Sequence, residues 1–257
     1  MVFPMESFAQ MQGFFWVLVR ISIILFLMPF FGARGIPVIW KAGLSLMLAM
    51  ILTPVVPLLD NFPNTMLEIV LSVISEMLIG VVLAFTVRIL FASVQMAGQF
   101  ISFQMGFAMA RAMDPQTGNQ TTVLSQFLYL LAVLIFFTID GHHLFIHALV
   151  SSFHSVPLNS FSMNSDLADV IIRGSSGMFI IGIKIAAPIM VALFLSNLSL
   201  GIVARTVPQV NILMIGFPIN ICIGLVLLGL VLRNLPPFFS DAVRHMGRDL
   251  VRLIHLM

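Results

Sequence analysis

Long apolar runs with few charged residues recur along this chain and restrict what it can fold into. The strongest occupy residues 11–31, 67–91, 123–149, 176–200 and 210–232. A sixth run, 42–59, ends at the prolines of TPVVP. A helix needs about 20 residues, rising about 1.5 Å each, to cross a hydrocarbon core of about 30 Å. Most of these runs are therefore long enough to cross a membrane.

Composition agrees with a membrane environment. Only 9% of the residues are charged and 60% are hydrophobic, whereas a soluble domain carries about 25% charged residues. Strands of a membrane barrel alternate in polarity over about ten residues, and these runs are longer and do not alternate. We therefore predict an all-α, polytopic integral membrane protein of about six long apolar helices. The stretch 93–110, which contains three glutamines and two glycines, is predicted to be amphipathic or partly irregular.

Several classes of function are excluded by what the sequence lacks. The net charge of +2 and the absence of a Lys/Arg block argue against nucleic acid as a partner. The motifs GxSxG and GxxxxGK[ST] do not occur, so we expect neither a nucleophile elbow nor nucleotide hydrolysis. The single cysteine, Cys222, cannot form an internal disulfide. We expect a protein that is not an enzyme and needs no cofactor.

The C-terminal tail has a helical pattern of its own. Apolar residues recur at three- and four-residue spacing, with arginines on the other face: Val243, Met246, Leu250, Leu253 and Met257. This pattern predicts an amphipathic helix that lies on a membrane surface or on a partner. The charges of the loops do not assign the tail to one side of the membrane, because its four arginines conflict with the side that counting the spans gives.

Ionisable residues inside the apolar runs need partners, since a charge at membrane depth costs at least a few kcal/mol. Glu76 and Lys184 lie well inside their runs, and Asp140 lies near the end of another. Arg20 and Arg88 are the other ionisable residues in these runs, so the set contains both signs of charge. We expect structural ion pairs, within the chain or across a subunit interface. The alternative is a proton or ion relay.

The stretch DGHHLFIH raises the question of a metal. Asp140, His143 and His147 share one face of a helix, and the two histidines have the i,i+4 spacing of zinc-binding helices. HExxH is absent, and no cluster of Cys or Glu supplies further ligands. We therefore predict no metal, and interpret these side chains as polar residues at the interfacial end of a span.

Methionines recur every four residues in QFISFQMGFAMARAMDPQTGNQTT, residues 99–122. A stripe of methionines usually belongs to a core. Here it follows a segment rich in Gly and Ala that would be a poor lipid-facing helix, and flexible thioethers suit a seal that closes and then yields. We predict a pore plug or gate formed by Met105, Gly106, Phe107, Met109 and Met113.

Two long motifs resemble those of the FliR family of flagellar export-gate proteins and their relatives in virulence type III secretion. They are ARTVPQVNILMIGFPI, residues 204–219, and GFAMARAMDPQTGNQ, residues 106–120. DGHH at 140–143 and MPFFGARGIP at 28–37 are similar to FliR segments as well. The resemblance runs over nearly the whole chain, in order.

The resemblance implies a particular role and architecture. Proteins of this family assemble with FliP and FliQ into a pore in the bacterial inner membrane, within the flagellar basal body, and FlhB and FlhA contact that pore. Unfolded flagellar subunits pass through it. The helices are expected to form hairpins within a single membrane domain, 1–257. That domain would comprise a FliP-like part, 1–172, a FliQ-like hairpin, 173–232, and a basic amphipathic tail, 233–257.

Prolines and polar residues interrupt the apolar sequence between the last two runs. Pro208 and Pro218 are expected to prevent a continuous helix, which makes 201–211 a turn. The resemblance implies that this turn contacts FlhB or a neighbouring hairpin. The predicted contact residues are Arg205, Pro208, Gln209, Asn211, Gly216 and Pro218. A plain interfacial loop with a snorkelling arginine is the alternative.

Three classes of function remain open at the level of sequence. The first is a pore subunit for protein export, surrounded by membrane lipid and other subunits. The second is a proton-coupled membrane transporter that would use Glu76, Asp140 and Lys184. The third is a membrane metalloenzyme built on Asp140, His143 and His147.

Overall fold

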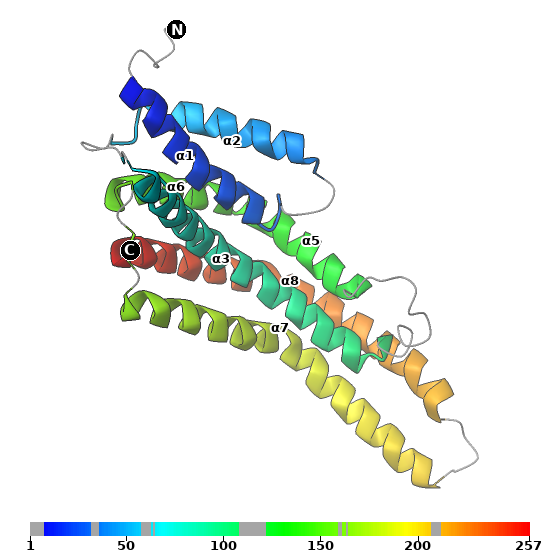
Figure 1. Ribbon diagram of the computed structural model, residues 1–257. Coiled ribbons are helices and arrows are strands. Elements are labelled where there is room, and N and C mark those ends of the chain that lie inside the picture. The colour runs from blue at the N-terminus through cyan, green and yellow to red at the C-terminus, as the bar shows by residue number, and fades with distance from the viewer. Residues whose placement is uncertain are drawn as a thin grey trace. The chain divides into compact units, whose positions relative to one another are not determined.

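The computed structural model describes residues 8–31, 36–57, 63, 65–107, 122–158, 161, 162, 164–206 and 212–257. Within these residues all the regular structure is helical, as predicted. The helices are α1 (Phe8–Leu27), α2 (Val38–Leu52), α3 (Met66–Gln104), α5 (Val123–Thr138), α6 (Gly141–Ser155), α7 (Ser165–Thr206) and α8 (Ile212–Leu256) (Figure 1).

Three of the described helices are long and apolar enough to cross a membrane: α3, α7 and α8. The broken pair α5 and α6 raises the number to four if it counts as one span, and α1 and α2 are shorter. The prediction of about six long helices was therefore wrong in number. The run 123–149 is not one helix, because Asp140 takes a left-handed conformation with φ 56° between α5 and α6. The arrangement as hairpins stays a prediction.

Helix α3 is longer than the sequence indicated. Its N-terminus is fixed by a capping box, in which the Thr65 hydroxyl accepts from the Glu68 N–H and the Glu68 carboxylate accepts from the Thr65 N–H, each at 3.3 Å. The helix then continues as far as Gln104, through most of the stretch 93–110 that was predicted to be amphipathic or partly irregular, and residues 108–110 lie outside the described residues. Gly98 lies inside this helix and does not break it. A Cβ at this position would lie 2.5 Å from Ser125 Cα, so only glycine leaves room for the neighbouring helix. The glycine serves a close approach to α5.

Helices α7 and α8 contain prolines, one of which, Pro218, was expected to interrupt the helix. Pro188 lies inside α7, and Pro218, Pro236 and Pro237 lie inside α8. The prediction that Pro218 prevents a continuous helix was wrong, and α7 runs to Thr206 instead of turning at residue 201. Long helices tolerate proline where neighbouring helices and local adjustments satisfy the freed carbonyls. The C-terminal tail is consequently the end of α8, not a separate helix.

The chain divides into two compact units, to both of which α3, α7 and α8 contribute. Unit 1 contains residues 1–90, 140–175 and 243–257. Its helices α1 and α2 pack side by side (Figure 1). The apolar face of the tail, Val243, Met246, Leu250, Leu253 and Met257, is buried, while Arg244, Arg248 and Arg252 are exposed.

Unit 2 contains residues 91–139 and 176–242. Its core has an aromatic cluster in which the Phe91 ring meets those of Tyr129, Phe136 and Phe239 edge to face at 5.4–6.0 Å. Such T-shaped pairs add about 0.5–1.5 kcal/mol each to the free energy of area burial. The division into FliP-like and FliQ-like parts at residues 172 and 173 remains a prediction.

Candidate functional site

The predicted gate segment begins where α3 ends, in unit 2. The last helical hydrogen bond runs from the Met105 N–H to the Ile101 carbonyl at 2.9 Å, and the Gly106 N–H then bonds to the Phe103 carbonyl at 3.1 Å. Gly106 takes a φ of +90°, which side chains with a Cβ rarely adopt. A left-handed glycine in this position is a common way to end a helix. Gly106 is therefore the residue at which the chain leaves α3.

Two glycines allow the end of α3 to pack closely against α8. A Cβ at Gly224 would lie 2.7 Å from the Cγ and Sδ atoms of Met105, so the Met105 thioether occupies the space that a side chain would fill. A Cβ at Gly106 would lie 2.6 Å from the Phe217 ring. Met105 is fully buried, and Phe107 is 37% exposed. The described start of the methionine stripe is thus a packed junction, and Met109 and Met113 lie outside the described residues.

A buried ion pair lies in unit 1. The Arg20 Nε donates to Glu76 Oε2 at 2.6 Å and the Arg20 Nη2 donates to Glu76 Oε1 at 3.1 Å, which makes the contact bidentate. Both side chains are 0% exposed. The guanidinium also donates to the carbonyls of Ser152 and Val156 at 3.1–3.4 Å, and it lies 4.4 Å from the centroid of the Phe153 ring. This pair joins α1, α3 and α6.

The sequence singled out Glu76 without identifying its partner. The two residues are 56 positions apart, so no local spacing could have paired them. Gly80, one turn after Glu76, helps to bring the helices together: a Cβ there would lie 3.2 Å from the Arg20 carbonyl oxygen. The charge that Glu76 needed is therefore supplied within the chain.

Lys184 has a different environment, on α7 in unit 2. Its side chain is exposed, and it lies on the face of the helix that also exposes Ile180, Val191 and Leu195. With Pro188 and Asn234 it lines an open cavity of about 170 Å³. Within the described part of the chain no ion pair of Lys184 is found. Lys184 is thus an exposed basic residue in the middle of a membrane-length helix.

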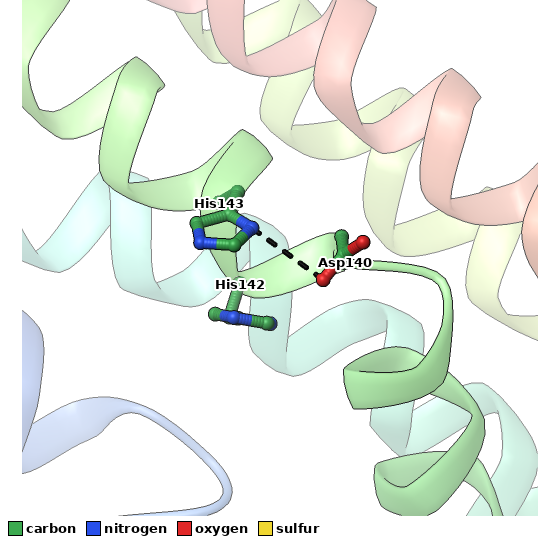
Figure 2. Close-up of side chains that lie close together, drawn as sticks. All are labelled: Asp140, His142 and His143. Carbon is green, nitrogen blue, oxygen red and sulfur yellow. Dashed lines mark ion pairs between the residues drawn. The ribbon is translucent and has the colours of Figure 1, made fainter.

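The third predicted ionisable residue, Asp140, lies in unit 1 immediately before α6. Its Oδ1 is 3.5 Å from His143 Nδ1, and both side chains are about 70% exposed (Figure 2). The structure groups Asp140 with His142 and His143, not with His147, whose Nδ1 is 3.4 Å from the Ser151 hydroxyl. The predicted Asp140–His143–His147 face is found in part: Asp140 lies beside His143, and His143 and His147 share α6, but Asp140 is left-handed and precedes the helix.

The predicted contact residues around 201–218 are only partly described. Arg205 is exposed in the last turn of α7, Gly216 is buried, and Pro218 is exposed on α8. A Cβ at Gly216 would meet Leu200 at 3.3 Å, so this glycine permits close packing of α7 and α8. Pro208, Gln209 and Asn211 lie outside the described residues.

A small polar network between α7 and α8 escaped the sequence analysis. The Asn220 side chain is buried and bridges both helices, since its Oδ1 accepts from the Ser196 hydroxyl at 2.9 Å and its Nδ2 donates to Asn197 Oδ1 at 2.6 Å. The sequence feature that could have indicated this network is the asparagine within the apolar stretch FPINICIG. Hydrogen bonds between helices in lipid contribute about 0.6 kcal/mol on average.

These features define a class: an all-helical membrane protein with a buried ion pair and a cation on an outward-facing helix surface. Comparison with known proteins makes the class specific. The sequence profile described as "Bacterial export proteins, family 1" matches residues 11–246. "Flagellar biosynthetic protein FliR" of Bacillus subtilis (strain 168) is 36% identical over 221 residues, which cover 84% of each chain.

Two further relatives carry the same description. "Flagellar biosynthetic protein FliR" of Pectobacterium carotovorum is 36% identical over 225 residues, covering 88% of this chain and 86% of its own. "Flagellar biosynthetic protein FliR" of Escherichia coli (strain K12) is 32% identical over 225 residues, which cover 88% of this chain and 86% of the relative. The chain therefore belongs to the FliR family of bacterial export proteins. The family resemblance that the sequence motifs indicated is confirmed.

Proposed function

We propose that this chain is a non-enzymatic subunit of the flagellar type III protein export gate in the bacterial inner membrane. It would form, with FliP and FliQ, a pore through which unfolded flagellar subunits pass during assembly of the flagellum. FlhB and FlhA would contact that pore. The observation that carries the proposal is the match of the export family over residues 11–246, together with relatives that are named as flagellar biosynthetic proteins.

The surface of the chain supports a role as a subunit. Helix α7 exposes large apolar side chains along its length, among them Phe179, Ile183 and Phe194 at 50–59% exposure. Lipid could cover these residues, but it offers no carboxylate within the hydrocarbon core for Lys184. A neighbouring apolar helix that carries an acidic residue would cover both. We therefore infer that the Lys184 face of α7 is a subunit contact.

The residues that follow α3 are the proposed closure of the pore. Met105 packs against Gly224 of α8, as described above, so the first residue of the proposed plug is fixed in place. Phe107, the last described residue of this segment, is exposed. In this proposal residues 105–113 form part of the plug, and flexible thioethers fill the gap until a substrate moves them aside.

The turn between α7 and α8 is the proposed contact with FlhB or a neighbouring subunit. Arg205 is exposed at the end of α7, where its charge also complements the negative end of the helix. Replacing Arg205 with Glu is expected to weaken that contact while the chain stays inserted in the membrane. Cross-links from residue 205 that reach only lipid would contradict this part of the proposal.

Co-purification tests the proposal as a whole. The full-length chain, carrying a short C-terminal tag, is expressed with the complete set of flagellar export genes and isolated in mild detergent. We expect FliP and FliQ in the same particle at fixed ratios by native mass spectrometry. A chain that is stable alone or as a small homo-oligomer, with neither protein bound, would instead favour the proton-coupled transporter.

A further inference from the structure

Three potential metal ligands meet at the start of α6. Asp140 precedes the helix, and His142 and His143 lie in its first turn. One donor atom from each of these residues lies within 4.8 Å of the other two. Figure 2 shows the Asp140 carboxylate and the His143 ring turned toward one another, with the His142 ring beside them. The two imidazole rings are 4.2 Å apart between centroids.

The Asp140 carboxylate is not used in the way that its position predicts. Aspartate before a helix normally accepts a hydrogen bond from a backbone N–H of the first turn. Asp140 makes no such capping bond, and it is the only described residue other than glycine with a positive φ. This conformation directs the carboxylate to the imidazole of His143 instead. An exposed ion pair contributes little to stability, so the pair alone does not account for the arrangement.

The distances fit a shared ion. Zinc bonds to imidazole nitrogen and carboxylate oxygen at about 2.0–2.2 Å, which places two ligands of a tetrahedral ion roughly 3.4 Å apart. His143 Nδ1 and Asp140 Oδ1 are 3.5 Å apart. His142 has to close a gap of at most about 1.4 Å, which a rotation of its side chain can supply. Two imidazoles and one carboxylate suit zinc, copper or nickel more than magnesium or calcium, which prefer oxygen ligands.

We propose that Asp140, His142 and His143 form a binding site for one divalent transition-metal ion, with Zn²⁺ as its test ion. The ion would clip the first turn of α6 to the left-handed residue before it. Because Asp140 and His143 are about 70% exposed, the ion would keep open positions for water. The site is distinct from the proposed gate segment, and it holds or fails independently of the export function.

The experiment uses the full-length protein, purified in detergent with a tag other than polyhistidine and stripped with a chelator. Zn²⁺ binding is measured by competition with a chromophoric chelator, and Co²⁺ is titrated for its visible absorption bands. Variants His142→Ala, His143→Ala and Asp140→Asn are compared with His147→Ala. This last variant is the matched control, because His147 is an exposed histidine one turn further along the same helix.

We expect one Zn²⁺ per chain, at least a tenfold weaker affinity in each of the three site variants, and wild-type affinity in His147→Ala. Zn²⁺ should also raise the Tm of the wild-type protein by a few degrees and leave the Tm of the site variants unchanged. The proposal is overturned if the folded wild-type protein does not bind Zn²⁺, Ni²⁺ or Cu²⁺. It is equally overturned if His147→Ala loses as much affinity as His143→Ala, or if Mg²⁺ binds as well as Zn²⁺.

Discussion

Arg20 and Glu76 form a bidentate ion pair with no solvent exposure on either side chain. The pair links helices that are far apart in sequence, and the guanidinium also bonds to two carbonyls near the end of α6. Taking two charges out of water is costly, so such a pair persists only where its geometry is good. Loss of one member leaves the other charge buried and unpaired.

Replacing Glu76 with Ala should therefore destabilise unit 1 by about 3–5 kcal/mol. We expect a marked loss of membrane-inserted protein and a lower Tm in detergent. Glu68→Ala is the control on the same helix, because Glu68 is exposed and takes part in the cap of α3. It should lose no more than about 1–2 kcal/mol.

The double variant Arg20→Met/Glu76→Leu should be more stable than Glu76→Ala alone, because no charge is then left buried. This comparison separates a structural pair from a relay. If Glu76→Ala accumulated and assembled like the wild type while export stopped, Glu76 would belong to an ion path and not to a structural pair.

Gly106→Ala should destabilise the end of α3 by about 1–3 kcal/mol, because alanine at a φ of +90° is strained and its Cβ would meet the Phe217 ring. Gly229→Ala is the matched control, since a Cβ there would have no atom within 4 Å. That variant should be neutral or slightly stabilising, as expected for alanine in a helix. Thermal unfolding of both proteins in detergent gives the comparison. Equal Tm values would show that the Gly106 contact is unimportant.

Gly224→Ala should displace the Met105 thioether, because the added Cβ would lie 2.7 Å from it. Met105→Ala removes that thioether, so the two substitutions should be coupled and the double variant less destabilised than the sum of the singles. In the assembled gate, Met105→Ala should also raise ion leakage across the membrane. A tight membrane with normal assembly would place the closure elsewhere.

Lys184→Glu should reduce recovery of the assembled complex more than Lys184→Met does, because it sets a negative charge against the partner carboxylate that we infer. The chain itself should stay folded, since Lys184 is exposed within it. Lys41→Met is the control for loss of a cation elsewhere. Native gel electrophoresis of detergent extracts measures the amount of complex. Equal recovery of the three variants would argue that the Lys184 face meets lipid and not a subunit.

Features that depend on local sequence could be predicted, whereas contacts between residues far apart in sequence could not. Apolar runs and composition predicted the helices and the membrane, because both are local properties. The pairing of Arg20 with Glu76 is tertiary, so only the need for a partner was visible. Pro218 was given too much weight, since its effect was judged from an isolated helix, whereas it lies inside α8.

The site residues show the same limit. A strict helical repeat predicted that Asp140, His143 and His147 share one face, but Asp140 is left-handed and precedes the helix, and its cluster contains His142 and His143. Gly98 and Gly106 were interpreted as signs of an amphipathic or partly irregular segment, and no role was predicted for Gly224. Gly98 and Gly224 instead admit Ser125 and Met105 at close range, and such contacts between helices leave no pattern in a single sequence.

In the proposed function, unfolded flagellar subunits pass through a gate that includes this chain. The most direct test places a photo-crosslinking amino acid at Phe107, in a strain where a flagellar substrate fused to a stably folded domain is arrested during export. The control positions are Ile39, exposed on α2, and Leu198, exposed on α7. We expect a cross-link from position 107 to the arrested substrate, and none from the control positions or without the substrate. An assembled complex in which position 107 never reaches the substrate would contradict it.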